Sequence, residues 1–309
     1  RGNIGDGLPA MQASVYGATT LKLNNKGEIF IISPSGFVSL IRKIDGQGIM
    51  RKFLDTVTPR YLESIAKSKY KGKVQTGELA TITTFSDFAF DQKGNMFISD
   101  RLNHQIRKVD SKGNITTIAG TGESGYYGDG GPASEAAFRD PSALATDKEG
   151  NLYIADGANN LIRKIDTKGI ISTIAGNGKH DNSGDGGSAL EASIRNMDYL
   201  KVSPKGELHI VGMNSNIIRK VTRDGKIVNV AGRGYQGYSG DGGLATKAML
   251  KSPLAIAFDS KNNMYITDMG NNRIRKVDAN GIISTFAGTG NFGWAQDGET
   301  VEIYLHKFP

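Results

Sequence analysis

An internal repeat with a period of 56 residues constrains the fold of this chain more than any other feature. The pair Arg-Lys begins at positions 107, 163, 219 and 275, and Gly-Asp-Gly-Gly fills 128–131, 184–187 and 240–243. Since two unrelated motifs recur in one register, each period is a structural unit. Complete units lie at approximately 5–71, 72–127, 128–183, 184–239 and 240–295, and 296–309 begins a further unit.

Each unit predicts four short strands. In unit 128–183, runs rich in β-branched and aromatic residues are separated by turns of Gly, Asn and Asp. These runs are Ser142–Asp147, Asn151–Asp156, Leu161–Asp166 and Ile170–Gly176. Four antiparallel strands repeated around an axis form the blades of a β-propeller, a closed ring that protects sheet edges. We therefore expect an all-β chain with one propeller domain over 1–309. Six blades, five full and one split, is the preferred count; a five-bladed ring is the alternative.

Two stretches carry a resemblance to a known family. They read NLYIADGANNLIRKIDTKGIISTIAGNG, followed by GDGG, and NMYITDMGNNRIRKVDANGIISTFAGTG, followed by QDG. Both resemble the bacterial type of NHL-repeat propeller. The resemblance is strong over 86–295 and weaker in the first unit, where Ser33 and Pro34 replace the aspartate and its tight turn. It implies a fold but no single activity, and it implies a secreted, periplasmic or cell-surface location.

Composition excludes several classes of protein. The chain has no cysteine and four scattered histidines, which excludes disulfides and thiolate catalysis and disfavours a histidine-rich metal site. The apolar runs are far shorter than the roughly 20 residues of a membrane-spanning helix, so we expect no membrane insertion. The net charge of +7 is compatible with an acidic partner but does not identify one. The oligomeric state stays open.

A strand-end aspartate and a strand arginine recur in the units. Because a buried arginine must be paired, we interpret them as structural ion pairs rather than as a nucleic-acid surface. Gly212 takes the aspartate position in the fourth unit, which argues against strict pairing there. The residues of this expected set are Asp100, Arg107, Asp156, Arg163, Arg219, Asp268 and Arg275.

The Gly-Asp-Gly-Gly loops offer Asp129, Asp185 and Asp241 as weak candidates for a metal site. They match neither a phosphate-binding loop nor a calcium loop. Our structural interpretation is that each aspartate caps the following Ala-rich segment. We predict no cofactor, and a structural or channel divalent cation remains an open alternative.

The linkers between units carry aromatic residues just before the aspartate. We expect these linkers to share one propeller face, with the variable aromatic and polar composition of a recognition surface. The alternative is that these residues only pack the loops against neighbouring blades. The candidate binding residues are Tyr126, Tyr127, Tyr235, Tyr238, Phe292, Trp294 and His180.

The sequence features leave three functions open. The first is a non-catalytic scaffold that binds protein or glycan through the aromatic loops, because no catalytic cluster emerges and no catalytic residue is assigned. The second is a metal-dependent hydrolase or lyase of the gluconolactonase or amidating-lyase type, for which Asp87, Asn196 and Asp198 lie near first strands. The third is RNA binding, which we do not expect because the basic residues are interleaved with acids and the aromatics lie elsewhere. We interpret the basic stretch 61–74 as a solvated insertion between the first two blades, with a partner or phosphate contact as the alternative.

Overall fold

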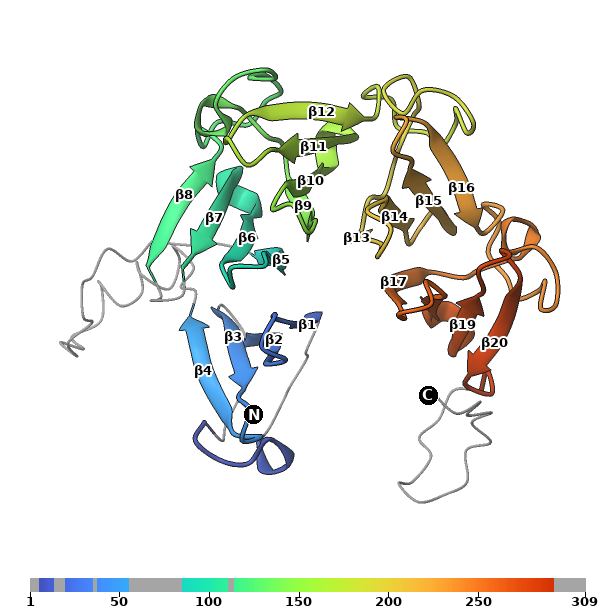
Figure 1. Ribbon diagram of the computed structural model, residues 1–309, viewed down its shortest axis with the longest axis horizontal. Helices are drawn as coiled ribbons and strands as arrows, with labels where there is room; N and C mark the ends of the chain where they lie inside the picture. Colours follow the sequence, from blue (N-terminus) through green and yellow to red (C-terminus); the bar gives the residue numbers. More distant parts are fainter. Residues whose placement is uncertain (1–5, 14–19, 36–37, 56–84, 111–113, 292–309) are drawn as a thin grey trace. The chain divides into compact units, whose positions relative to one another are not determined.

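Five four-stranded sheets make up the chain where the computed structural model describes it, at residues 6–13, 20–35, 38–55, 85–110 and 114–291 (Figure 1). The first two sheets are β1 (Thr20–Leu23), β2 (Ile29–Ser35), β3 (Val38–Ile44), β4 (Met50–Asp55), and β5 (Phe85–Phe90), β6 (Met96–Asp100), β7 (Gln105–Val109), β8 (Ile115–Ala119). The third is β9 (Pro141–Thr146), β10 (Leu152–Asp156), β11 (Leu161–Ile165), β12 (Ile171–Ala175). The last two are β13 (Tyr199–Val202), β14 (Leu208–Gly212), β15 (Ile217–Val221), β16 (Ile227–Ala231), and β17 (Pro253–Phe258), β18 (Met264–Asp268), β19 (Arg273–Val277), β20 (Ile283–Ala287).

Every strand pairs with the next strand in the chain, so each sheet is one up-and-down blade. The pairing is antiparallel, as in Ile210↔Arg219 between β14 and β15. The prediction of an all-β chain of four-stranded propeller blades is confirmed. The structure shows five blades, and a sixth stays a prediction, since residues 292–309 lie outside the described part.

A left-handed residue ends the turn between the second and third strands of a blade. Short 3-10 turns, such as η4 (Gly157–Asn159) and η6 (Met269–Asn271), are followed by Asn160 at φ 54° and Asn272 at φ 50°. Asparagine adopts this backbone region more readily than most residues. The sequence Asn-Asn in these units is therefore the signature of this turn.

The Gly-Asp-Gly-Gly loops are hydrogen bonded to the fourth strand of their own repeat. The Gly242 N–H donates to the Ile283 carbonyl at 2.8 Å, and the Ile283 N–H donates to the Gly243 carbonyl at 2.9 Å. Gly240 must lack a side chain here, since a Cβ would lie 2.7 Å from the Cα of Ala248. The linker is therefore fastened to the outermost strand of the blade that follows it.

The second strands of the blades form the centre of the core. Every residue of β6, β10 and β14 is buried, as expected for a strand packed on both faces. Strand β18 alternates instead, because Tyr265 and Thr267 are only half-buried. One face of the β17–β20 sheet is therefore less covered than its counterparts.

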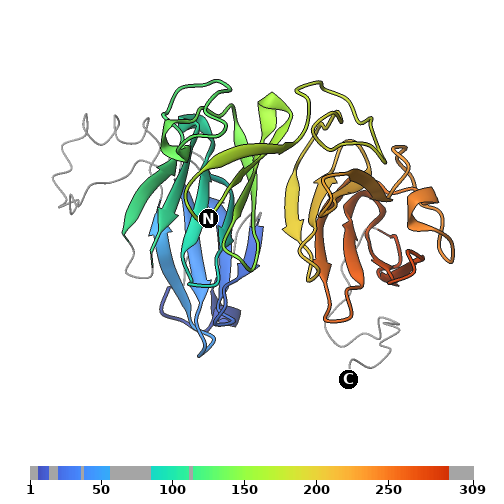
Figure 2. The ribbon, with the colours of Figure 1, turned by 45° about the horizontal axis from the view of Figure 1, so that its top comes forward.

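The chain consists of two compact units, 1–152 with 165–172, and 153–164 with 173–309. In the first unit, the sheets β1–β4 and β5–β8 pack face to face through Phe30, Phe88 and Ile98 (Figure 2). In the second, Val211 and Ile218 pack against Ile256 and Ile266. Among the described residues, no helix is long and apolar enough to cross a membrane.

Candidate functional site

The recurring arginine of the third strand is buried in most blades. Arg42, Arg163 and Arg275 are fully buried, and Arg219 is nearly so. A guanidinium removed from water needs hydrogen bonds and an opposite charge to offset its lost hydration. The partners of these arginines therefore decide how each blade is held together.

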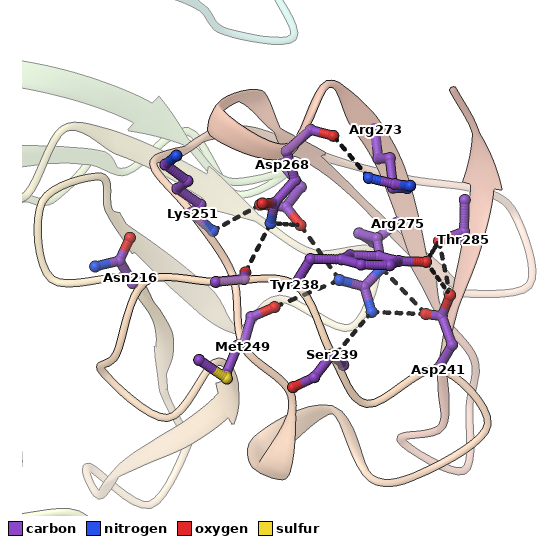
Figure 3. Close-up of polar contacts among 12 residues, drawn as sticks. Asn216, Tyr238, Ser239, Asp241, Met249, Lys251, Asp268, Arg273, Arg275 and Thr285 are labelled. Atoms are coloured by element: carbon purple, nitrogen blue, oxygen red, sulfur yellow. Dashed lines mark hydrogen bonds and ion pairs between the residues drawn. The ribbon is translucent and has the colours of Figure 1, made fainter. Parts of the chain in front are cut away.

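In blade β17–β20, the arginine has two carboxylate partners (Figure 3). Arg275 Nη2 lies 2.6 Å from Asp241 Oδ1 and donates to the Ser239 carbonyl at 3.2 Å, while Arg275 Nη1 lies 3.2 Å from Asp268 Oδ2. Asp268 also accepts hydrogen bonds from the Asn271 side chain at 2.8 Å. One arginine thus joins the linker loop, the end of β18 and the start of β19.

Tyr238 covers this arginine from the outside. The Arg273 and Arg275 guanidinium carbons lie 3.9 and 4.9 Å from its ring centre, and its hydroxyl donates to Asp241 Oδ2 at 2.9 Å (Figure 3). Burial acts to raise the pKa of the Asp241 carboxyl, but hydrogen bonds from Thr285, Arg275 and Tyr238 outweigh it and lower that pKa. Tyr238, although 44% exposed, is part of the structural network.

The other blades vary this arrangement. Arg42 pairs with Asp6 at 2.8 Å and Arg163 with Asp156 at 3.5 Å. Arg107 hydrogen bonds to Gln105 and Thr117, and within the described part of the chain it has no carboxylate partner. The ion pairs expected from the repeat therefore form in some blades and not in others.

Blade β13–β16 lacks the strand-end aspartate. Arg219 instead lies 2.9 Å from Asp185 and donates to the Ser193 and Ser183 carbonyls. A Cβ on Gly212 would lie 2.0 Å from Ser215 Oγ, so this position has no room for a carboxylate. The aspartate of the linker is sufficient to pair the arginine there.

The loop aspartates hold side chains of the chain itself. Asp185 and Asp241 receive guanidinium groups, and Asp129 accepts a hydrogen bond from the Tyr126 hydroxyl at 3.2 Å. The expected capping is not found, because the 3-10 turns Ala133–Glu135 and Ala245–Lys247 have no side-chain cap. Among the described residues, no three acidic or histidine side chains are grouped to hold a metal ion.

The predicted aromatic residues are exposed but differ in what holds them. The hydroxyl of Tyr127 contacts Thr121 and Glu123, and His180 Nδ1 lies 3.1 Å from Asn160 Oδ1. Tyr235 is 69% exposed, and its hydroxyl has no hydrogen-bond partner in the described chain. Phe292 and Trp294 lie outside the described residues. Tyr235 is thus the described loop tyrosine that the fold does not use.

The sequence of this chain is similar to those of known proteins. A family model described as the Teneurin NHL domain matches residues 121–183 and 233–298, which carry the arginine and linker motifs. These matched stretches are NHL repeats. Teneurin-m of Drosophila melanogaster is 32% identical over 63% of this chain, and Teneurin-3 of Mus musculus is 29% identical over 63%. The match covers 8% of the length of each of these relatives.

Solved structures share the fold of these NHL repeats at low identity. A protein of unknown function from Bacteroides thetaiotaomicron has a TM-score of 0.60 at 17% identity, covering 93% of this chain and 61% of that one. A streptogramin B lyase has a TM-score of 0.53 at 15% identity, covering 92% and 71%. These likenesses show the fold alone. The bacterial subtype of the repeat remains a prediction, since the relatives named above are animal teneurins.

The NHL blades also contain an inner ion pair that sequence reasoning missed. Lys22 on β1 lies 2.6 Å from Asp87 on β5, and the second Asp87 oxygen accepts the Leu144 N–H of β9 at 3.0 Å. Asp87 was a candidate channel ligand, and here its carboxylate joins three first strands of one unit. Sequence reasoning missed Lys22 because the first repeat differs in length from the others, so the 56-residue period does not align its positions with theirs.

The remaining channel candidates lie at the start of the β13–β16 blade. Asn196 adopts φ 53°, and Asp198 Oδ2 accepts the Met213 N–H at 2.7 Å. Burial raises the pKa of the Asp198 carboxyl, although the side chain is exposed at one side. Asn196 and Asp198 thus precede the same first strand, β13, whereas Asp87 belongs to β5 of the other compact unit.

Proposed function

We propose that this chain is a non-catalytic binding module that recognises a protein through its linker loops. The observation that carries the proposal is the contrast between Tyr235 and Tyr238. Tyr238 is occupied by Arg273, Arg275 and Asp241, whereas Tyr235, three residues earlier, is exposed with a free hydroxyl. An exposed aromatic residue on a rigid support is characteristic of a binding hot spot.

The support under the loop is well ordered by hydrogen bonds. The Gly237 N–H donates to the Leu250 carbonyl at 3.1 Å, and the Asn271 side chain donates to the Gly237 carbonyl at 2.7 Å. A loop fixed in this way loses little conformational freedom when a partner binds. The other loop aromatics, Tyr126, Tyr127 and His180, are proposed as further contacts of the same kind.

The relatives agree with an interaction role outside the cell. Teneurin NHL domains are matched in sequence, so we propose a protein partner before a glycan, and a secreted, periplasmic or cell-surface location. We propose further that a sixth blade covers the half-buried face of β18 that carries Tyr265 and Thr267. The metal-dependent hydrolase or lyase alternative has no supporting observation beyond fold likeness.

A binding screen tests the function. The purified chain and its Tyr235→Ala variant are probed in parallel against an array of extracellular proteins and an array of glycans. We expect protein ligands that bind the wild type and bind the variant at least tenfold more weakly, as for hot-spot residues. Ligands found on the glycan array alone, or turnover of a lactone substrate by both proteins, would contradict the proposal.

A further inference from the structure

Six residues of the second unit lie on the linker that carries Tyr235 or close to its neighbouring elements. They are Arg233, Tyr235, Met249, Lys251, Met269 and Arg273, and together we call them the Arg233 patch. Four of them come from the linker before blade β17–β20, while Met269 begins the 3-10 turn η6 and Arg273 begins β19. Most of the patch therefore stands on the same rigid loop as Tyr235.

Direct contacts join several members of the patch. The Arg233 guanidinium lies 3.4 Å from the Met249 sulfur and 5.7 Å from the Tyr235 ring centre. Gly237 packs against Met249, since a Cβ there would lie 2.5 Å from the methionine methyl. The side chain of Lys251 runs past Gly270, which directly follows Met269, a residue that is 46% exposed.

The positive charge of the patch is not paired with a carboxylate in the described part of the chain. Arg233, Lys251 and Arg273 have no carboxylate partner among the described residues; Arg273 donates only to backbone carbonyls, at Asn271 and Thr289. The acids of this linker and turn are Asp241 and Asp268, and both already pair with Arg275. The linker thus carries two exposed cations, Arg233 and Lys251, and the half-buried Arg273 adds a third positive charge at the start of β19.

The equivalent positions in the other repeats do not form such a patch. In the 121–161 stretch they are Thr121, Glu123, Ala137, Arg139, Gly157 and Leu161. The buried arginine framework is shared between repeats, but the patch is confined to one linker. A feature that the blade does not need for folding points to a role in recognition.

We infer that the Arg233 patch binds an acidic peptide segment of a partner protein, an inference that rests on the proposed function. Guanidinium groups match carboxylates in a two-pronged geometry, and Tyr, Met and Arg are the residues enriched at protein interfaces. The two methionines favour peptide side chains over sugar hydroxyls, because a flexible thioether adapts to apolar groups of varied shape. The patch contributes the charged centre of a larger contact.

A set of peptides tests this inference. Fluorescence anisotropy is measured with labelled peptides of 15 residues that contain Asp, Glu and one or two apolar residues, and with lysine-rich peptides of equal length. The proteins are the wild type, the double variant R233E/K251E and Y235A. The matched control is Lys179→Glu, which reverses a charge at the position equivalent to Tyr235 in the preceding linker.

We expect the acidic peptides to bind the wild type and K179E alike, and R233E/K251E at least tenfold more weakly. Y235A should also bind them more weakly, and thermal unfolding should show that all variants fold. Stronger binding of a heparin oligosaccharide or a single-stranded RNA at the same patch would overturn the inference. So would acidic-peptide binding that survives both patch variants, or no peptide binding at all.

Failure of the inference and failure of the proposed function remain distinguishable. If a protein ligand from the array binds R233E/K251E as it binds the wild type, the chain is a binding module but the patch is not its acidic-peptide site. If neither arrayed proteins nor acidic peptides bind the wild type, both proposals fail.

Discussion

The guanidinium of Arg275 lies 2.6 Å from the carboxylate of Asp241, 34 residues earlier in the chain, and Arg219 stands in the same relation to Asp185. Both pairs join a linker loop to the third strand of the blade that follows. The 56-residue repeat thus carries an ion pair that connects its first residues with its middle. This relation makes the linker part of the blade.

Loss of this arginine should strongly destabilise its blade. Arg275→Ala leaves Asp268 fully buried without its cation, and breaking a buried pair typically costs about 3–5 kcal/mol. Arg107→Ala, at the same repeat position but without a carboxylate partner in the described chain, should cost clearly less. Urea denaturation of both variants compares the two costs, and equal values would show that the carboxylate pairing contributes little.

Two glycines with similar backbone angles separate strain from close contact. Gly232 has φ +83° and a Cβ on it would lie 2.2 Å from the Asn216 carbonyl oxygen, whereas Gly242 has φ +82° and open space. Gly242→Ala should cost about 1 kcal/mol from backbone strain alone. Gly232→Ala should lower the free energy of unfolding by at least about 2 kcal/mol more than Gly242→Ala does, because the backbone must also move. The change in unfolding midpoint tests this difference.

Stability should fall in acid because of His209. Burial lowers its pKa to about 4, with the nearby Lys220 acting in the same direction and Glu207 opposing it. The unfolded chain therefore binds a proton that the folded chain rejects, so the contribution of His209 is complete above pH 6.5 and is lost as the pH falls toward 4. The loss amounts to roughly 3 kcal/mol at most.

The variant His209→Tyr isolates this effect. Equivalent positions hold Phe97, Tyr153 and Tyr265, so an aromatic ring suits the site, where His209 already packs against Phe258. The raised pKa of Asp198 makes stability change with pH in the opposite direction, and this effect is present in both the wild type and the variant. Unfolding free energy measured from pH 4 to 7 should be flatter for the variant. Parallel curves for the two proteins would refute the role of His209.

Tyr235 and Tyr238 should respond differently to truncation. Tyr238→Ala removes a hydroxyl bonded to Asp241 and a ring stacked on two guanidinium groups, and it should cost about 2 kcal/mol or more. Tyr235→Ala should stay within about 0.5 kcal/mol of the wild type, because it removes an exposed ring whose contact with the Arg233 guanidinium, at 5.7 Å, also lies at the surface. Thermal unfolding of the pair decides whether the two roles are distinct.

The aspartate missing from blade β13–β16 should be restorable in two steps. Gly212→Asp alone collides with Ser215 and should destabilise the protein. In the other blades an asparagine at the position of Ser215 bonds the strand-end aspartate, as Asn271 bonds Asp268. Adding Ser215→Asn should therefore recover part of the loss. Additive costs in a double-mutant cycle would contradict this coupling.

The sequence was sufficient to predict the blades because the repeat presents each strand several times. Four-strand units, the left-handed asparagine turn and the all-β class all follow from motifs that recur in phase. The relation of Asp241 to Arg275 was not predicted, because alternation along a strand shows which residues share a face but not which loop returns to them. Asp268 was chosen as the partner, and it turned out to be one of two.

The binding surface was harder to predict than the fold. Tyr235 and Tyr238 look alike as loop aromatics, and their difference comes from a ring contact with Arg273 that no spacing reveals. Arg233 and Met249 were missed because each differs from the residues at its repeat positions, which are Asn177 and Thr121 for Arg233 and Ser193 and Ala137 for Met249. The absence of repetition at an exposed position was the available signal.

The linker glycines have one more consequence, for how a gene of this kind changes. The described Gly-Asp-Gly-Gly linkers bond the fourth strand of their own period, as Gly186 does with Ile227 and Gly242 with Ile283, and the fourth strands before them end on a glycine bonded to the linker, as Gly176 is to Ala189 and Gly232 to Ala245. These periods therefore meet through the same pair of contacts. Duplication or deletion of a stretch of 56 codons recreates these junctions wherever it begins. Blade number can thus drift in evolution while each surviving blade keeps all its bonds.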